Sequence, residues 1–128
     1  MERLEIINDI AKLFELHGVE TCNQIIEDEM NKVEQYALEK SSSEEFWNII
    51  KHSPFYWDKI ILNDEIISLP PCQIFNFTYE TDKGLTGALV SDYRTGPPDT
   101  IELYMEAVPD NVLENVLKIL ENKLKYEN

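Results

Sequence analysis

The side chains best suited to metal binding or nucleophilic catalysis are few: two histidines, His17 and His52, and two cysteines, Cys22 and Cys72. Neither histidine has a second histidine or a cysteine at zinc-ligand spacing, because an expected helix break separates His17 from Cys22. Cys72 would need a nearby base and a lowered pKa to act as a nucleophile, and the abundant acids oppose thiolate formation. The sequence therefore predicts two buried thiols in a reducing compartment, with no metal site and no catalytic cysteine.

Phosphate-binding and glycosidase chemistry also lack their signatures. The four glycines are dispersed, and no Gly-Lys-Ser/Thr motif follows any of them. Glu102 and Glu106 lie four residues apart on one expected strand, about 13 Å along it, which is too far for the paired acids of a glycosidase. We expect no enzymatic activity and no cofactor, and keep an enzyme with an unfamiliar site as the least favoured alternative.

The most unusual property of the chain is its strongly negative net charge. Twenty-five acidic residues against 11 lysines and arginines leave a net charge of -14, with a pI near 4.4. Residues 1–50 carry 12 acids and four bases, and residues 60–117 carry ten acids and two bases, so each segment has a net charge of -8. This field repels nucleic acid and anionic membranes and attracts cationic proteins. We therefore expect a cationic protein partner, although solubility alone is a competing explanation.

Apolar residues recur at three- and four-residue spacing in the first part of the chain, which predicts helices. The first covers residues 2–16 and ends at His17-Gly18, where the glycine can take a left-handed cap conformation. The second begins with Thr21 as its N-cap. Its expected buried stripe is Cys22, Ile25, Ile26, Met30, Val33 and Ala37. A short third helix begins at Ser43.

Strands follow from about residue 57. "WDKIILNDEIISLPP" predicts two short strands around an Asn63-Asp64 turn, closed by Pro70-Pro71. "CQIFNFTYE", "LTGALVSD" and "TIELYME" predict an antiparallel meander connected by "ETDKG" and "YRTGPPD". A final helix begins at Pro109-Asp110 and directs inward Leu113, Val116, Leu117, Leu120 and Leu124. We expect one α+β domain over residues 1–128: N-terminal helices, an antiparallel sheet of four or five strands, and a C-terminal helix.

The expected location is the cytoplasm. No stretch approaches the roughly 18 apolar residues that a membrane span requires. The N-terminal "MERLEIINDI" is charged and does not resemble a signal sequence.

The strand "TIELYME" supplies the candidate binding surface. If Ile101, Leu103 and Met105 face the helices, the alternate residues look outward. Tyrosines rimmed by carboxylates suit docking to a cationic surface, because the rings give rigid contact and the acids pair with Lys or Arg. The strand and its connecting segments give these predicted partner-binding residues: Glu80, Asp82, Asp92, Tyr93, Asp99, Glu102, Tyr104 and Glu106.

Two other interpretations of the acidic residues stay open. The strand face can be an ordinary solvated surface with incidental acids. A second acidic cluster on the second helix can present a binding face instead, although such a run is more often the wet side of a helix. That cluster consists of Glu27, Asp28, Glu29 and Glu34.

In its length, acidity and α+β order ending in "TIELYMEAVPDNVLENVLKILENKL", the chain resembles the small immunity proteins of bacterial contact-dependent growth inhibition and related polymorphic toxin systems. Such proteins bind a cognate toxin, often a basic nuclease, and block its active site. The resemblance implies that carboxylates occupy the place of substrate phosphates in a cationic cleft. The alternative is an acidic mimic of nucleic acid that inhibits a DNA- or RNA-binding protein. The sequence leaves the toxin's activity and the oligomeric state open.

Overall fold

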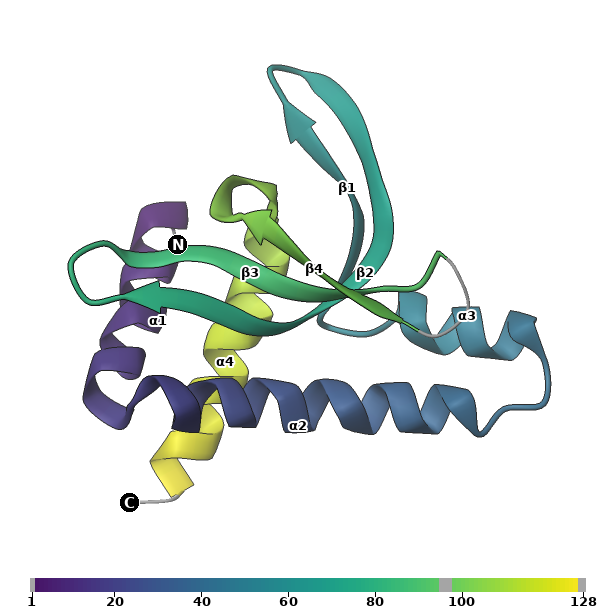
Figure 1. Ribbon diagram of the computed structural model, residues 1–128, viewed down its shortest axis with the longest axis horizontal. Helices are drawn as coiled ribbons and strands as arrows, with labels where there is room; N and C mark the ends of the chain where they lie inside the picture. Colours follow the sequence, from purple (N-terminus) through teal and green to yellow (C-terminus); the bar gives the residue numbers. More distant parts are fainter. Residues whose placement is uncertain (1, 95–97, 127–128) are drawn as a thin grey trace.

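The computed structural model describes residues 2–94 and 98–126. Within them the order is α1 (Arg3–His17), α2 (Val19–Leu38), α3 (Ser43–Lys51), β1 (Tyr56–Leu62), β2 (Glu65–Glu80), β3 (Gly84–Asp92), β4 (Asp99–Tyr104), the 3-10 turn η1 (Met105–Ala107) and α4 (Asp110–Tyr126). The four strands form one antiparallel sheet in chain order, β1-β2-β3-β4 (Figure 1). The predicted α+β class and the meander are confirmed. Residues 95–97 of the predicted β3–β4 loop lie outside the described residues.

Gly18 separates the first two helices in a single residue. Its φ of 95° lies in the region that favours glycine, and its N–H donates to the Phe14 carbonyl at 2.9 Å. Helix α2 then starts directly at Val19. The predicted N-cap at Thr21 is therefore wrong, because Gly18 already redirects the chain and Thr21 lies inside the helix. The predicted stripe of α2 is confirmed, since each of its residues is buried or half-buried.

Strand β2 is longer and more bent than predicted. Its N-terminal half pairs with β1 and its C-terminal half with β3. The predicted strand end at Pro70-Pro71 is wrong, because the two prolines fall where the register shifts from Trp57↔Cys72 to Lys59↔Ser68. A proline, which has no N–H to donate, is tolerated at such an irregularity. The Pro71 carbonyl still accepts a hydrogen bond from the Tyr93 N–H at 3.0 Å.

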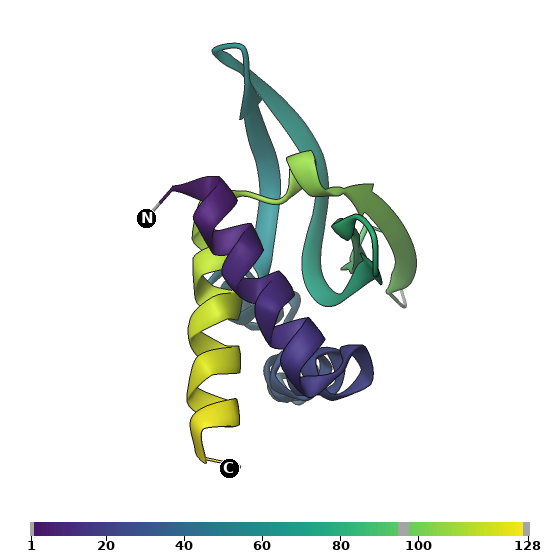
Figure 2. The same cartoon turned by 90° about the vertical axis from the view of Figure 1, so that its left-hand side faces the viewer.

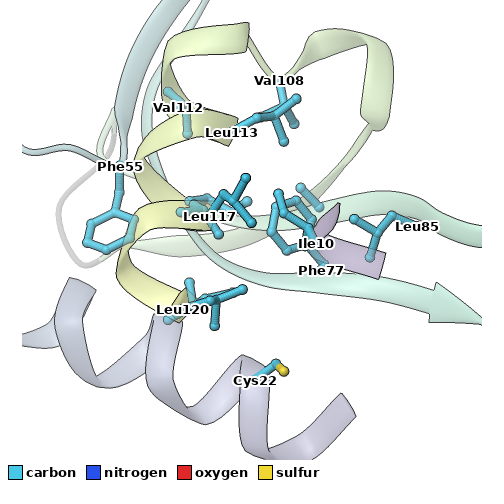
Figure 3. Close-up of a cluster of buried hydrophobic side chains, with 14 of the residues drawn as sticks. Ile10, Cys22, Phe55, Phe77, Leu85, Val108, Val112, Leu113, Leu117 and Leu120 are labelled. Carbon is cyan, nitrogen blue, oxygen red and sulfur yellow. The ribbon is translucent and has the colours of Figure 1, made fainter. Parts of the chain in front are cut away.

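The main core lies between the sheet and three of the helices. Helices α1, α2 and α4 gather on one side of the sheet (Figure 2). Side chains from all of them meet those of the sheet in one cluster, part of which Figure 3 shows. The residues of α4 predicted to point inward are all buried, as is Val112. A smaller cluster under α3 contains Ala37, Ile50 and Tyr93 with half-buried Phe46, Trp47, Ile49 and Tyr56.

Arg3 fastens the start of α1 to the η1–α4 junction. Its Nη1 donates to the Val108 carbonyl at 2.7 Å and to the Asp110 carboxylate at 2.8 Å, and its Nη2 donates to the Met105 carbonyl. One guanidinium thus satisfies two backbone carbonyls and pairs with an acid in the first turn of α4. These contacts fix the segment that follows β4.

The outer part of the β1–β2 hairpin projects away from the helices as an arm, defined here as residues 58–69 (Figures 1 and 2). Its tip is a two-residue turn in which Asn63 and Asp64 have φ values of 51° and 64°. Positive φ at both positions is the geometry of the tight turns that match strand twist. The predicted Asn63-Asp64 turn is confirmed.

Candidate partner-binding surface

Strand β4 has one face packed against the core and one face exposed to solvent. Ile101 and Leu103 are half-buried and pack against the main core, as predicted. Thr100, Glu102 and Tyr104 are exposed, and the Tyr104 side chain is 81% exposed. Because β4 is the last strand in the sheet order, its outer edge is also unpaired within the described residues. The predicted alternation is confirmed.

Gly87 explains why the Tyr104 ring stands free. It is the cross-strand partner of Tyr104, so β3 presents no side chain opposite the ring. A Cβ at this position would lie 2.8 Å from the Leu103 carbonyl oxygen and 3.5 Å from Glu102 Oε1. The register also shifts beside it, since Thr78 pairs with Gly87 and the next pair skips one residue of β3. The glycine therefore serves a close approach and a bulge at once.

Three carboxylates lie along β4 and the turn after it, of which Glu102 shares a strand face with Tyr104 and Asp99 lies on the opposite face. Asp99 and Glu102 are exposed on β4, and Glu106 is exposed on η1. None of the three forms an ion pair within residues 2–94 and 98–126. The predicted strand is two residues too long, because η1 begins at Met105, whose side chain is buried as expected. We call Asp99, Glu102, Tyr104 and Glu106 the acidic edge.

Two further predicted residues lie beyond the end of β4. Glu80 and Asp82 are exposed around the β2–β3 turn. The β2–β3 turn ends at Gly84, which precedes Gly87 on β3 by three residues, a distance of about 10 Å. Glu80 is 3.5 Å from Lys83, so part of its charge is already balanced. These two acids continue the negative charge beyond the acidic edge, and Lys83 partly neutralises it.

The predicted surface position of Tyr93 is wrong. The side chain is only 6% exposed and lies edge-on to Phe46 and Trp47, with ring centroids 6.1 and 6.3 Å away. Its hydroxyl accepts a hydrogen bond from Gln73 Nε2 at 2.8 Å and donates to Glu34 at 2.6 Å. Burial and the Glu34 carboxylate raise the pKa of Tyr93. The chain turns inward after β3, so this tyrosine completes the small core under α3.

The predicted surface position of Asp92 is also wrong. This residue is 6% exposed, and its carboxylate accepts hydrogen bonds from Arg94, with Nε at 3.0 Å and Nη2 at 2.9 Å. Burial acts to raise the pKa of Asp92, but the hydrogen bonds and charge of Arg94 outweigh it and lower the pKa. A carboxylate already satisfied by its own chain is poorly placed to bind a partner.

The competing acidic cluster on α2 is largely engaged within the molecule. Glu29 lies 3.0 Å from Lys32 and 3.2 Å from Lys123, and these contacts lower its pKa against the opposing effect of burial. The other three acids accept hydrogen bonds from neighbours: Glu27 from Asn76, Asp28 from Gln24 and Glu34 from Tyr93. The acidic edge is therefore the more available of the two surfaces.

The two cysteines considered for catalysis are buried, and burial opposes formation of their thiolates. The Cys72 thiol donates to the Trp57 carbonyl at 3.5 Å, and burial, followed by Asp92 and Asp58, raises its pKa to about 12. Burial raises the pKa of Cys22 to about 11. His52 Nδ1 is 2.6 Å from the Asn48 carbonyl at the end of α3. In the described part of the chain, no group of three or more His, Cys, Asp or Glu residues is placed to hold a metal ion.

A concavity of about 390 Å³ lies between α3 and the base of the arm. Its lining includes Trp47, Lys51 and Tyr56, whose hydroxyl donates to Asp58 at 3.1 Å. Burial, followed by Asp58, raises the pKa of Tyr56. The tyrosine is thus held protonated, which suits a structural hydrogen bond better than proton transfer.

No helix in residues 2–94 and 98–126 combines the length and apolar composition needed to cross a membrane. The sequence matches no family model, and no curated protein or solved structure is significantly similar to the chain.

Proposed function

We propose that this chain is an immunity protein that binds a cognate basic toxin, such as a nuclease, and occludes its active site. The observation that carries the proposal is the acidic edge: Tyr104 is 81% exposed and is flanked by carboxylates that have no ion pair in the described residues. Exposed, unpaired acids around a rigid ring are the features that a cationic protein surface complements.

The physical roles of the residues follow from their positions. Tyr104 would enter a pocket of the partner as a rigid anchor, because Gly87 leaves the ring without a cross-strand neighbour. Glu102 and Glu106 would pair with lysine or arginine side chains around that pocket. The net charge of -14 would accelerate encounter with a basic protein. Occlusion of a nuclease cleft needs no catalytic group on this chain.

Mimicry of nucleic acid is a second candidate with less support. Duplex DNA carries one charge about every 1.7 Å along its axis. On β4, Asp99 and Glu102 are three residues apart, or about 10 Å, and their odd spacing places them on opposite faces of the strand. Carboxylates this sparse reproduce a phosphate array poorly, whereas a tyrosine anchor is better suited to a specific protein cleft.

The test uses the protein encoded by the reading frame adjoining this chain's gene. We expect that protein to be basic and to arrest growth when expressed alone, and we expect co-expression of this chain to restore growth. A neighbouring protein that is harmless, or whose toxicity this chain does not relieve, contradicts the proposal.

The binding surface is then tested by calorimetry with the purified pair. Tyr104→Ala combined with Glu102→Lys should weaken binding at least about tenfold, the size expected for losing one interfacial anchor and reversing one charge. The matched control is Tyr36→Ala with Glu39→Lys, because Tyr36 is 54% exposed on α2 and Glu39 is exposed beside it. Equal loss in both variants would exclude the acidic edge as the specific site.

A further inference from the structure

The arm carries apolar side chains on both of its faces. Ile60 pairs with Ile67 and Ile61 pairs with Ile66, and successive pairs of a hairpin face opposite sides. Ile61 is 72% exposed, Ile66 is 68% exposed and Ile67 is 38% exposed, while Leu62 beside the turn is 52% exposed. An isolated two-stranded hairpin is marginally stable in water, and clustered exposed apolar residues mark interaction sites. The arm therefore has the properties of a contact surface.

A groove of about 500 Å³ lies beside the arm, between it and the η1–α4 junction. Ile60, Ile61, Val108 and Pro109 give it an apolar lining. Polar and charged residues complete the groove: Arg3, Lys59, Glu106, Asp110 and Asn111. Figure 2 shows η1 next to the lower part of the arm. The same molecule thus has an apolar projection and a partly apolar recess next to each other. Such an arrangement is self-complementary about a two-fold axis.

The charges along the arm also fit an antiparallel pairing of two arms. The tip carries Asp64 and Glu65, whereas Lys59 lies nearer the base. Asp58 also lies at the base, and its carboxylate accepts a hydrogen bond from the Tyr56 hydroxyl. None of Lys59, Asp64 and Glu65 forms an ion pair in the described parts of the chain. If two arms run antiparallel, the acidic tip of each meets Lys59 of the other.

The distribution of net charge also favours contact at the arm. Residues 51–71 contain two lysines and three acids, a net charge of -1, which leaves -13 of the total -14 elsewhere. Two copies that meet through their arms therefore contact each other through the least repulsive part of the chain. We propose that the occupant of the arm and its groove is a second copy of this chain, with the two arms packed antiparallel about a two-fold axis.

The experiment is sedimentation equilibrium of the purified protein over a range of concentrations. The chain has a mass of 15.0 kDa, and wild type should approach twice that mass. Ile61→Glu with Ile66→Glu should weaken association roughly 100-fold or more, because four charged groups enter the contact. The matched control is Leu4→Glu with Leu16→Glu, since these leucines are 72% and 77% exposed on α1. The control should associate as wild type does.

A charge exchange gives a second test that does not depend on the apolar residues. Lys59→Glu and Asp64→Lys should each weaken association roughly two- to fivefold per contact, and the double variant should restore it, because the exchange re-forms both pairs. Raising the salt concentration from about 0.1 M to about 1 M should not dissociate the pair, because salt screens the repulsion between two acidic bodies. A wild type that is monomeric throughout, or an isoleucine variant that still associates as wild type does, overturns the proposal. Equal dissociation of the α1 control also overturns it.

Discussion

The Asn23 side chain binds both backbone groups of Phe77. The Asn23 amide nitrogen donates to the Phe77 carbonyl at 3.0 Å, and its amide oxygen accepts from the Phe77 N–H at 2.9 Å. This stretch of β2 pairs with β3 on one side only, because β1 pairs with an earlier part of β2. One side chain of α2 therefore takes the place of a neighbouring strand and closes the sheet edge.

Replacing this amide should destabilise the fold. Asn23→Ala leaves the Phe77 N–H and carbonyl without their partner, at a cost of about 1–3 kcal/mol of unfolding free energy. Urea denaturation of wild type and variant measures the difference. Asn31→Ala is the matched control, since Asn31 is exposed on the same helix, and its effect should stay within about 0.5 kcal/mol. Equal stability of Asn23→Ala and wild type would show that the bidentate contact contributes nothing.

Removing the Tyr93 hydroxyl should lower the free energy of unfolding by more than the loss of its own hydrogen bonds. Tyr93→Phe leaves Gln73 Nε2 unpaired in a fully buried site, where Gln73 Oε1 already has no hydrogen-bond partner among the described residues. We expect a loss of about 1–3 kcal/mol. Adding Gln73→Leu should recover part of that loss, because the double variant has no buried amide to satisfy. Purely additive losses in urea denaturation would contradict this account, and Tyr104→Phe should be neutral.

Asp92 should make stability depend on acid pH. Its pKa is lower in the folded chain than in the unfolded chain, so its contribution is present at neutral pH and is lost as the pH falls. Asp92→Asn should therefore destabilise the protein at pH 7, and the difference from wild type should shrink below about pH 4. Urea midpoints measured across that range test this. Asp99→Asn serves as the control, because Asp99 is the exposed cross-strand partner of Asp92.

The cysteines should be unreactive in the folded protein and should affect stability at alkaline pH. Their pKa values of about 11 for Cys22 and about 12 for Cys72 lie above the unfolded value of about 8.5. Their contribution to stability is therefore complete below about pH 8.5 and is lost as the pH rises toward the folded values. Cys72→Ala should show a shallower fall of stability with pH above about 8.5 than wild type. A disulfide-exchange reagent should label both thiols in urea and neither in buffer, and fast labelling without urea would contradict the prediction.

The helices and the alternation of β4 could be predicted because local spacing determines them. The buried leucines of α4 and the wet face around Tyr104 follow from periods of 3.6 and two residues. The start of α2 was predicted three residues too late, because Gly18 at positive φ allows a turn in a single residue.

Features that depend on distant contacts could not be predicted. Tyr93 follows the end of a strand and is typical of a loop residue, but α3 places Phe46 and Trp47 around it. Pro70-Pro71 indicate a strand end locally, whereas β1 and β3 hold β2 on both sides of them. The isoleucines predicted the arm's two strands, but only the positions of the helices show that the arm projects beyond them.

Helix α4 supplies six buried side chains to the core: Val112, Leu113, Val116, Leu117, Leu120 and Leu124. During translation α1 and α2 are synthesised before the sheet and already contact it, since Phe14 of α1 packs edge-on against Phe77 of β2. The core still lacks the apolar side chains of α4 while its 17 residues are synthesised, which takes about 1–3 s at usual elongation rates. Through that interval part of the core of the nascent chain is exposed to water, so a chaperone that recognises apolar segments can engage it before the fold closes.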